Sequence, residues 1–131
     1  MMLYLDNAAT TLKKPLSVYA TLFKSTLFSG GNAGRGGHKM SMDAVRAIVD
    51  TQDLIAQLFN IKKAENIVFT QNATYALNTA ILGTMSNGGH IVVTEMDHNS
   101  VLRPAYLLGN YTVVKADKSG YVHAEDVENA V

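Results

Sequence analysis

Polar side chains lie between a predicted strand and a predicted helix in the middle of the chain. Residues 66–70 are β-branched and aromatic, and the segment 73–82 is rich in alanine and leucine. A helix that begins after such a strand presents free N–H groups and a positive dipole end, which suits a phosphate. Thr74 adds a hydroxyl, and Asn72 can cap the helix. The alternative is that Asn72 only caps a structural helix, since neither GxGxxG nor a P-loop is present.

A second polar cluster follows the predicted strand over 90–94. Its central residue is His98, in the run Glu-Met-Asp-His-Asn-Ser. Ligands usually bind at the carboxyl edge of a parallel sheet, and an imidazole there can stack on a planar ring or move a proton near neutral pH. The alternative is a surface histidine beside a helix cap formed by Asp97 or Asn99.

A third candidate is the glycine-rich loop over 29–37, in which five of nine residues are glycine. Asn32 lies in this loop, and Arg35 could bind a carboxylate or a phosphate. The alternative is a mobile connector with solvated charges, which we favour for Lys39.

The elements that position these residues alternate along the chain. Alternating strands and helices indicate βαβ units and a parallel sheet, so the fold class is α/β. Ser41 is expected to cap the second helix. The predicted strands are 3–5, 66–70, 90–94 and 111–115, and the predicted helices are 15–27, 42–59, 73–82, 100–108 and 125–131.

Composition excludes several classes of function. The 131 residues are 47% hydrophobic, which is enough for one globular domain. Eleven basic and eleven acidic residues cancel, so we expect neither nucleic acid nor a membrane surface as a partner. There are no cysteines, which excludes disulfides and a cysteine nucleophile within this chain. No metal-ligand pattern is visible. No signal peptide is visible either, and we expect a cytoplasmic protein.

Four motifs in order resemble one family. Residues 4–11 (YLDNAATT), 32–40 (NAGRGGHKM), 69–78 (FTQNATYALN) and 96–104 (MDHNSVLRP) are similar to segments of cysteine desulfurases and selenocysteine lyases. These enzymes belong to the class V aminotransferase group, which uses pyridoxal 5′-phosphate (PLP). The resemblance covers the whole chain. It implies the first part of the large domain of a fold-type I PLP-dependent transferase, with an incomplete sheet.

The resemblance also implies roles for individual residues. The N–H of Ala73 and the hydroxyl of Thr74 would hold the PLP phosphate, next to Asn72. His98 would stack on the pyridine ring and help to transfer a proton. Residues near the substrate entrance would be Asn7, Ala8, Ala9, Asn32 and Arg35.

The implied reaction converts cysteine to alanine and leaves sulfur as an enzyme-bound persulfide. In the family fold, strands from later in the chain flank residues 66–70, so the edges left unpaired lead us to expect a homodimer or higher association. The resemblance also implies a division into an entrance region over 1–30 and the PLP-binding region over 31–131. We expect the Schiff-base lysine and the catalytic cysteine beyond residue 131, because Lys39 follows the glycine loop without the aspartate that should precede it. The chain is therefore expected to be part of a longer protein and inactive by itself.

Two other functions remain open. One keeps the fold and cofactor but changes the reaction, as in a selenocysteine lyase or an aminotransferase for a small amino acid. The other is a non-catalytic α/β module that binds a phosphate ligand or a partner chain. A downstream cysteine on a flexible loop would separate the desulfurase from the first alternative.

Overall fold

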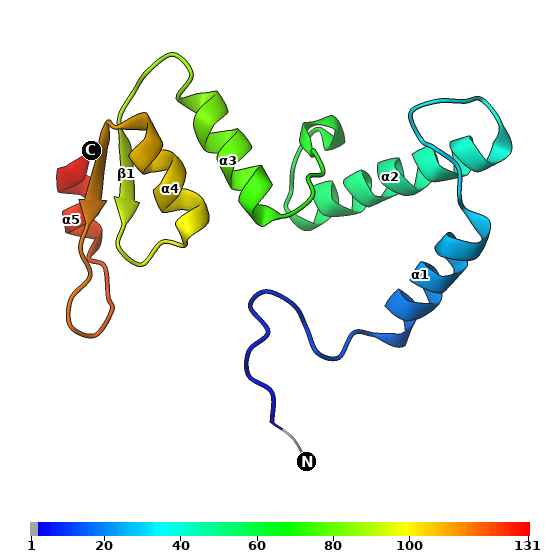
Figure 1. Cartoon of the computed structure of the whole chain (residues 1–131), viewed down its shortest axis with the longest axis horizontal. Helices are drawn as coiled ribbons and strands as arrows, with labels where there is room; N and C mark the ends of the chain where they lie inside the picture. Colours follow the sequence, from blue (N-terminus) through cyan, green and yellow to red (C-terminus); the bar gives the residue numbers. More distant parts are fainter. Residues whose placement is uncertain (1–2) are drawn as a thin grey trace. The chain divides into compact units, whose positions relative to one another are not determined.

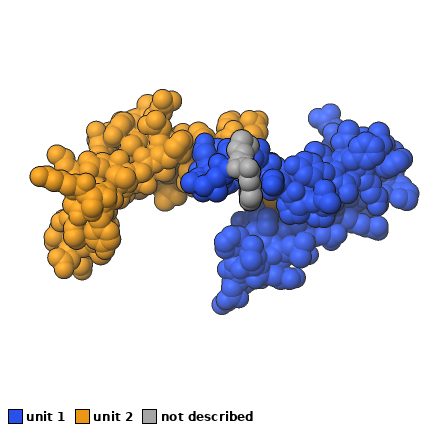
Figure 2. Space-filling model, turned by 90° about the horizontal axis from the view of Figure 1, so that it is seen from below, with its two compact units in different colours: residues 1–67 blue, residues 68–131 orange. Residues whose placement is uncertain are grey.

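The computed structural model describes residues 3–131. The chain divides into two compact units, residues 1–67 and 68–131, which Figure 2 shows in different colours. Among residues 3–131, no helix combines the length and the apolar character that a membrane span requires. The division expected at residue 30 concerns the arrangement of a whole enzyme and stays a prediction.

The first unit consists of helices and loops. It contains α1 (Leu16–Phe28), α2 (Lys39–Leu58) and the short 3-10 helix η1 (Ala64–Asn66). The side chain of Gln52 on α2 donates to the carbonyl of Ile67 at 2.7 Å, which ties the segment after η1 to this helix. By contrast, no residue of α1 is buried, and Phe23 on this helix is 67% exposed.

The glycine-rich loop is anchored to the start of α2. Ser41 is completely buried, and its hydroxyl donates to the Asn32 carbonyl at 2.7 Å. Gly31 passes so close to Met40 that a Cβ at this position would collide with the Met40 backbone. The expectation that Ser41 caps the helix is wrong, because the His38 ring accepts the Ser41 N–H and is the cap. The Ser41 hydroxyl is used instead to hold the loop.

The second unit contains a parallel sheet of two strands. Its elements are α3 (Ala73–Thr84), β1 (Ile91–Thr94), α4 (Asn99–Leu108), β2 (Tyr111–Val114) and α5 (Ala124–Ala130) (Figure 1). The strands pair in register from Ile91 opposite Tyr111 to Thr94 opposite Val114. α4 connects them, and it contacts α3 and both strands.

The core of the second unit is small. Val93 on β1, Val114 on β2 and Ala105 on α4 are the buried apolar side chains of its sheet and crossover helix. Pro104 is also buried, and it lies inside α4. α4 ends at Gly109, which has the left-handed φ of 78° that a residue without a side chain adopts readily.

The predicted α/β class with parallel strands and an incomplete sheet is confirmed, but two predicted strands are wrong. Residues 3–5 and 66–70 form no strand, although Ile67 has extended backbone angles. A β-strand is stabilised by hydrogen bonds to a neighbouring strand. No other segment of residues 3–131 pairs with 66–70, so this segment has no ladder.

The turn between β2 and α5 is built around one carboxylate. Oδ1 of Asp117 accepts from the Ser119 hydroxyl at 2.6 Å, the Ser119 N–H at 2.8 Å and the Tyr121 N–H at 3.0 Å. These hydrogen bonds, with that from the Ser119 hydroxyl the largest contribution, hold the pKa of Asp117 below its ordinary value of 3.8. The turn is therefore stabilised by the ionised form.

We predict that this turn loosens in acid. The lowered pKa contributes stability that is present above pH 3.8 and is lost as the pH falls through the folded-state pKa. An NMR titration should show the Asp117 carboxyl and the amides of Ser119 and Tyr121 changing together, with a midpoint below 3.8. Ser119→Ala removes the main donor and should raise that midpoint. A wild-type midpoint at or above the ordinary value would contradict the prediction.

Candidate functional site

The start of α3 matches the predicted phosphate turn. The side chain of Asn72 accepts the Tyr75 N–H at 2.9 Å, so the predicted cap is confirmed. The Asn72 carbonyl accepts from the Thr70 hydroxyl at 2.9 Å and from the Ala76 N–H at 3.1 Å. Among the hydrogen bonds of the described chain, the N–H groups of Ala73 and Thr74 and the Thr74 hydroxyl have no acceptor. They are available to a ligand.

The segment after β1 fixes the position of His98. Oδ2 of Asp97 accepts the Thr94 N–H at 2.7 Å and the Thr94 hydroxyl at 3.1 Å, which closes a turn at the end of the strand. His98 is then the N-cap of α4, and its Nδ1 accepts the Ser100 N–H at 3.1 Å. The alternative in which Asp97 or Asn99 caps this helix is wrong, because the histidine itself is the cap.

Asn78 joins the first turns of the two helices. Its side-chain N–H₂ donates to the Thr74 carbonyl at 2.9 Å and to the Ser100 carbonyl at 3.0 Å. One amide thus connects the helix that follows the phosphate turn with the helix that His98 caps.

The two predicted site segments of the second unit share an open hollow of about 410 Å³. Thr74 and His98 both line it. Arg103 is exposed there and is the only charged residue of the lining. The full lining is Thr74, Asn78, His98, Asn99, Ser100 and Arg103.

Four residues of this hollow were not predicted as site residues: Asn78, Asn99, Ser100 and Arg103. Asn78 lies one helical turn after Thr74, a spacing that places both on one helix face and that could have revealed it. Ser100 and Arg103 fall within the 96–104 motif, but the motif alone did not distinguish their roles. The buried Ser100 carries a hydroxyl that bonds to His98 Nδ1 at 2.9 Å.

The donors in the hollow fit a phosphate group. The N–H and hydroxyl of Thr74 at the helix N-terminus and the Arg103 guanidinium can donate to anionic oxygens, and no carboxylate lines the hollow. The resemblance implies phosphate binding by the Ala73 N–H and the Thr74 hydroxyl at this helix start, and that role stays a prediction.

The predicted entrance residues lie in the first unit. Oδ1 of Asn7 accepts the Leu12 N–H at 3.4 Å, and Ala8 and Ala9 are exposed beside it. Oδ1 of Asn32 accepts the Gly34 N–H at 2.7 Å, while Arg35 is exposed. Their place at a substrate entrance stays a prediction.

Lys39 has a local partner on the surface. Its ammonium lies 2.7 Å from Asp43 one turn along α2, and this hydrogen bond lowers the pKa of Asp43. The lysine side chain is 89% exposed. Such a solvated pair contributes little stability, and it gives the lysine neither the burial nor the cationic neighbour that activates an amine.

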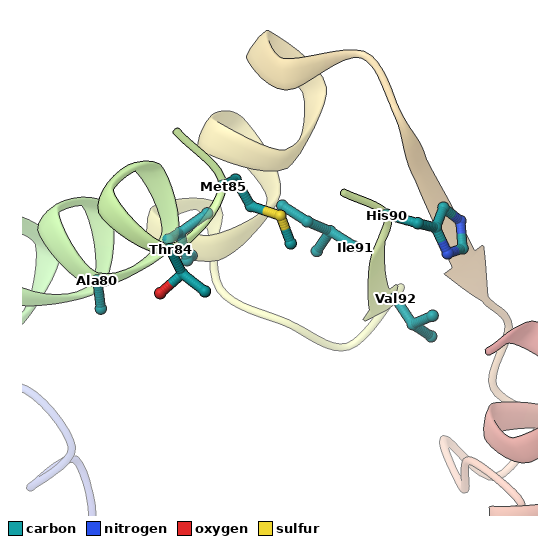
Figure 3. A pocket seen from close by; sticks show the side chains of 7 residues that line it. Ala80, Thr84, Met85, His90, Ile91 and Val92 are labelled. Atoms are coloured by element: carbon teal, nitrogen blue, oxygen red, sulfur yellow. The ribbon is translucent and has the colours of Figure 1, made fainter. Parts of the chain in front are cut away.

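A second hollow, of about 350 Å³, lies between the C-terminal half of α3 and β1. Figure 3 shows Thr84 and Met85 on its α3 side and Val92 on its strand side. His90 points toward β2, where its Nε2 lies 2.8 Å from the Thr112 hydroxyl. The lining is mainly apolar and includes none of the predicted site residues.

Comparison with known proteins identifies the family. The family model described as "Aminotransferase class-V" matches residues 3–131. The chain belongs to the class V aminotransferase family.

Its relatives include enzymes named for cysteine desulfuration. A "Probable cysteine desulfurase" of Aeropyrum pernix is 39% identical over 105 residues, which cover 77% of this chain and 25% of that protein. "Cysteine desulfurase IscS" of Plasmodium falciparum is 27% identical over 98% of this chain and 25% of its own length. The chain thus spans about a quarter of these relatives.

A solved structure confirms the fold class. A "NIFS-LIKE PROTEIN" superposes with a TM-score of 0.84 over 100% of this chain and 37% of its own, at 24% sequence identity. The likeness at this identity concerns the fold, and it agrees with the first part of a fold-type I transferase domain.

We predict that Asn78→Ala separates the two helix starts. The substitution removes both amide hydrogen bonds and leaves the partly buried Ser100 carbonyl without its side-chain donor, at a cost of about 1 kcal/mol. Amide hydrogen exchange in the first turn of α4 should accelerate about fivefold.

Asn99→Ala is the matched control. Asn99 lines the same hollow, and its side chain makes no hydrogen bond within the described residues. Exchange in that turn should change little in this variant. Equal effects of the two substitutions would show that Asn78 does not hold the helices together.

Proposed function

We propose that this chain is the N-terminal, phosphate-binding part of a PLP-dependent cysteine desulfurase. The observation that carries the proposal is the shared hollow, in which Thr74 from the phosphate turn and the His98 cap of α4 lie together. The relatives named cysteine desulfurase support the reaction, in which cysteine becomes alanine and its sulfur remains on the enzyme as a persulfide.

Different residues of the second unit bind the phosphate and the pyridine ring of PLP. The N–H groups of Ala73 and Thr74 and the Thr74 hydroxyl hold the phosphate, with Asn72 fixing the helix start. His98 lies against the pyridine ring and moves a proton on the substrate. When bound, PLP supplies the electron sink for the chemistry at the substrate amino acid.

The residues of the first unit serve the substrate. Asn7, Ala8 and Ala9 line its entrance together with the loop that carries Asn32 and Arg35. The buried Ser41 supports this role because its hydrogen bond to the Asn32 carbonyl fixes the loop to α2. The guanidinium of Arg35 is available to a substrate carboxylate.

The chain itself lacks two reactive groups of the proposed enzyme. It contains no cysteine to accept the sulfur, and its one lysine beside a histidine, Lys39, is paired on the surface. Both groups come from the rest of a longer polypeptide, which acts in the cytoplasm as a homodimer or higher assembly. The apolar side chains that α1 leaves exposed, Phe23 among them, support association.

The phosphate site can be tested on this chain with a ligand that lacks the reactive aldehyde. Pyridoxine 5′-phosphate and inorganic phosphate should shift the amide resonances of Ala73 and Thr74, whereas pyridoxine should not. Thr74→Val removes one hydrogen bond to a charged oxygen and should weaken binding about tenfold or more.

Thr84→Val is the matched control, because it makes the same change at the other end of α3. Its affinity should equal that of the wild type. Equal affinity of the Thr74 variant, or an equal response to pyridoxine, would overturn the assignment of this turn.

The reaction needs a separate test. The polypeptide that the source cell makes with this sequence should be identified by intact mass, then assayed with PLP and cysteine. We predict that this polypeptide produces alanine and a persulfide. Residues 1–131 alone should produce no more alanine than PLP and cysteine do without protein. Alanine production by the 131-residue chain would contradict the proposal that the reactive groups lie elsewhere.

A further inference from the structure

His98 uses one of its ring nitrogens within the protein. Nδ1 lies 3.1 Å from the Ser100 backbone nitrogen and 2.9 Å from the Ser100 hydroxyl. No other hydrogen bond of the Ser100 hydroxyl occurs within the described residues, and Ser100 is only 6% exposed. The ring itself is exposed in the hollow.

These contacts determine where the neutral ring carries its proton. A backbone N–H can only donate, so Nδ1 must accept with its lone pair. A ring nitrogen that accepts cannot carry a proton at the same time. The proton of the neutral imidazole is therefore on Nε2, and the Ser100 hydroxyl donates to Nδ1 as a second donor.

We propose that Ser100 is a positioning residue that reserves Nδ1 of His98 for the helix cap, so that the neutral ring presents Nε2–H to the hollow. This inference deepens the proposed function, because it assigns the ring nitrogen that faces the bound group. Only that role of Nε2 rests on the proposed function, and the position of the proton on the ring does not. Ser100 acts through His98 and does not itself touch the substrate.

The arrangement has a consequence for proton transfer. Nε2 already carries a proton, so a proton taken up by His98 must go to Nδ1. The imidazolium then has two N–H donors and no lone pair, so the Ser100 N–H loses its acceptor, whereas the Ser100 hydroxyl can turn and accept from Nδ1–H. Proton uptake by His98 is thus coupled to loss of the backbone hydrogen bond of the cap.

Few charged groups surround the ring. Arg103 lines the same hollow, and the neighbouring Asp97 is occupied by Thr94. The Glu95 carboxylate accepts the Ala116 N–H at 2.7 Å. The residues that α3 brings to the hollow, Thr74 and Asn78, are uncharged, so the coupling depends on the cap hydrogen bonds.

His38 provides an internal comparison. It also caps a helix, and its Nδ1 accepts the Ser41 N–H at 3.3 Å. The Ser41 hydroxyl, however, donates to the Asn32 carbonyl. His38 therefore has one donor on Nδ1, whereas His98 has two.

The test is ¹⁵N NMR of the imidazole rings of the chain without cofactor, at a pH where the rings are neutral. We expect His98 to show a protonated Nε2 and a hydrogen-bonded, unprotonated Nδ1. Ser100→Ala removes the hydroxyl and keeps the amide, so its Nδ1 resonance should move toward that of His38.

Each measurement can overturn the proposal. A proton on Nδ1 of neutral His98, or an unchanged Nδ1 resonance in Ser100→Ala, would do so. None of these readouts needs PLP or turnover. Failure of the cofactor or activity tests with a confirmed ring state would refute the proposed function while leaving the ring assignment intact.

Discussion

The parallel pairing of β1 with β2 determines the geometry of the candidate site. Parallel neighbours cannot be joined by a hairpin, so the chain must return across the sheet through a crossover helix. That helix is α4, and it has to begin where β1 ends. The Asp97 carboxylate occupies the N–H of the last strand residue, and the next residue, His98, starts the helix. The histidine therefore lies at the carboxyl edge of the sheet as a result of the strand pairing.

The second half of the site depends on a contact between two helix starts. Asn78 binds the first turn of α3 to the first turn of α4 with one amide. Two positive dipole ends and the Arg103 guanidinium consequently surround the same hollow. An anion placed there meets donors from both helices without an opposing carboxylate. The phosphate binding that we propose for this site would depend on this local field, because the whole chain has no net charge.

Sequence reasoning predicted the parts of the structure that short-range patterns determine. The five helices, the strands near 90–94 and 111–115 and the Asn72 cap follow from periodicity, β-branched runs and capping preferences. Residues 66–70 have the same β-branched character but form no strand, because a ladder requires a partner that composition does not reveal. The roles of Asn78, Ser41 and Ser100 were missed for a similar reason. Their hydrogen bonds link positions whose proximity arises only after the helices pack, or reuse a side chain that was expected to cap.

The scarcity of buried apolar side chains has a thermodynamic consequence. Within the described residues the apolar core consists of Ala56, Val93, Ala105 and Val114. The heat capacity change of unfolding scales with the apolar surface that becomes hydrated, and so does the dependence on denaturant concentration. Both quantities should be well below the usual values for a chain of this length, which are about 12–15 cal/mol/K per residue for heat capacity. Most of the apolar surface of the described residues thus stays hydrated when the chain folds by itself, so that folding releases only a small part of its hydrophobic free energy.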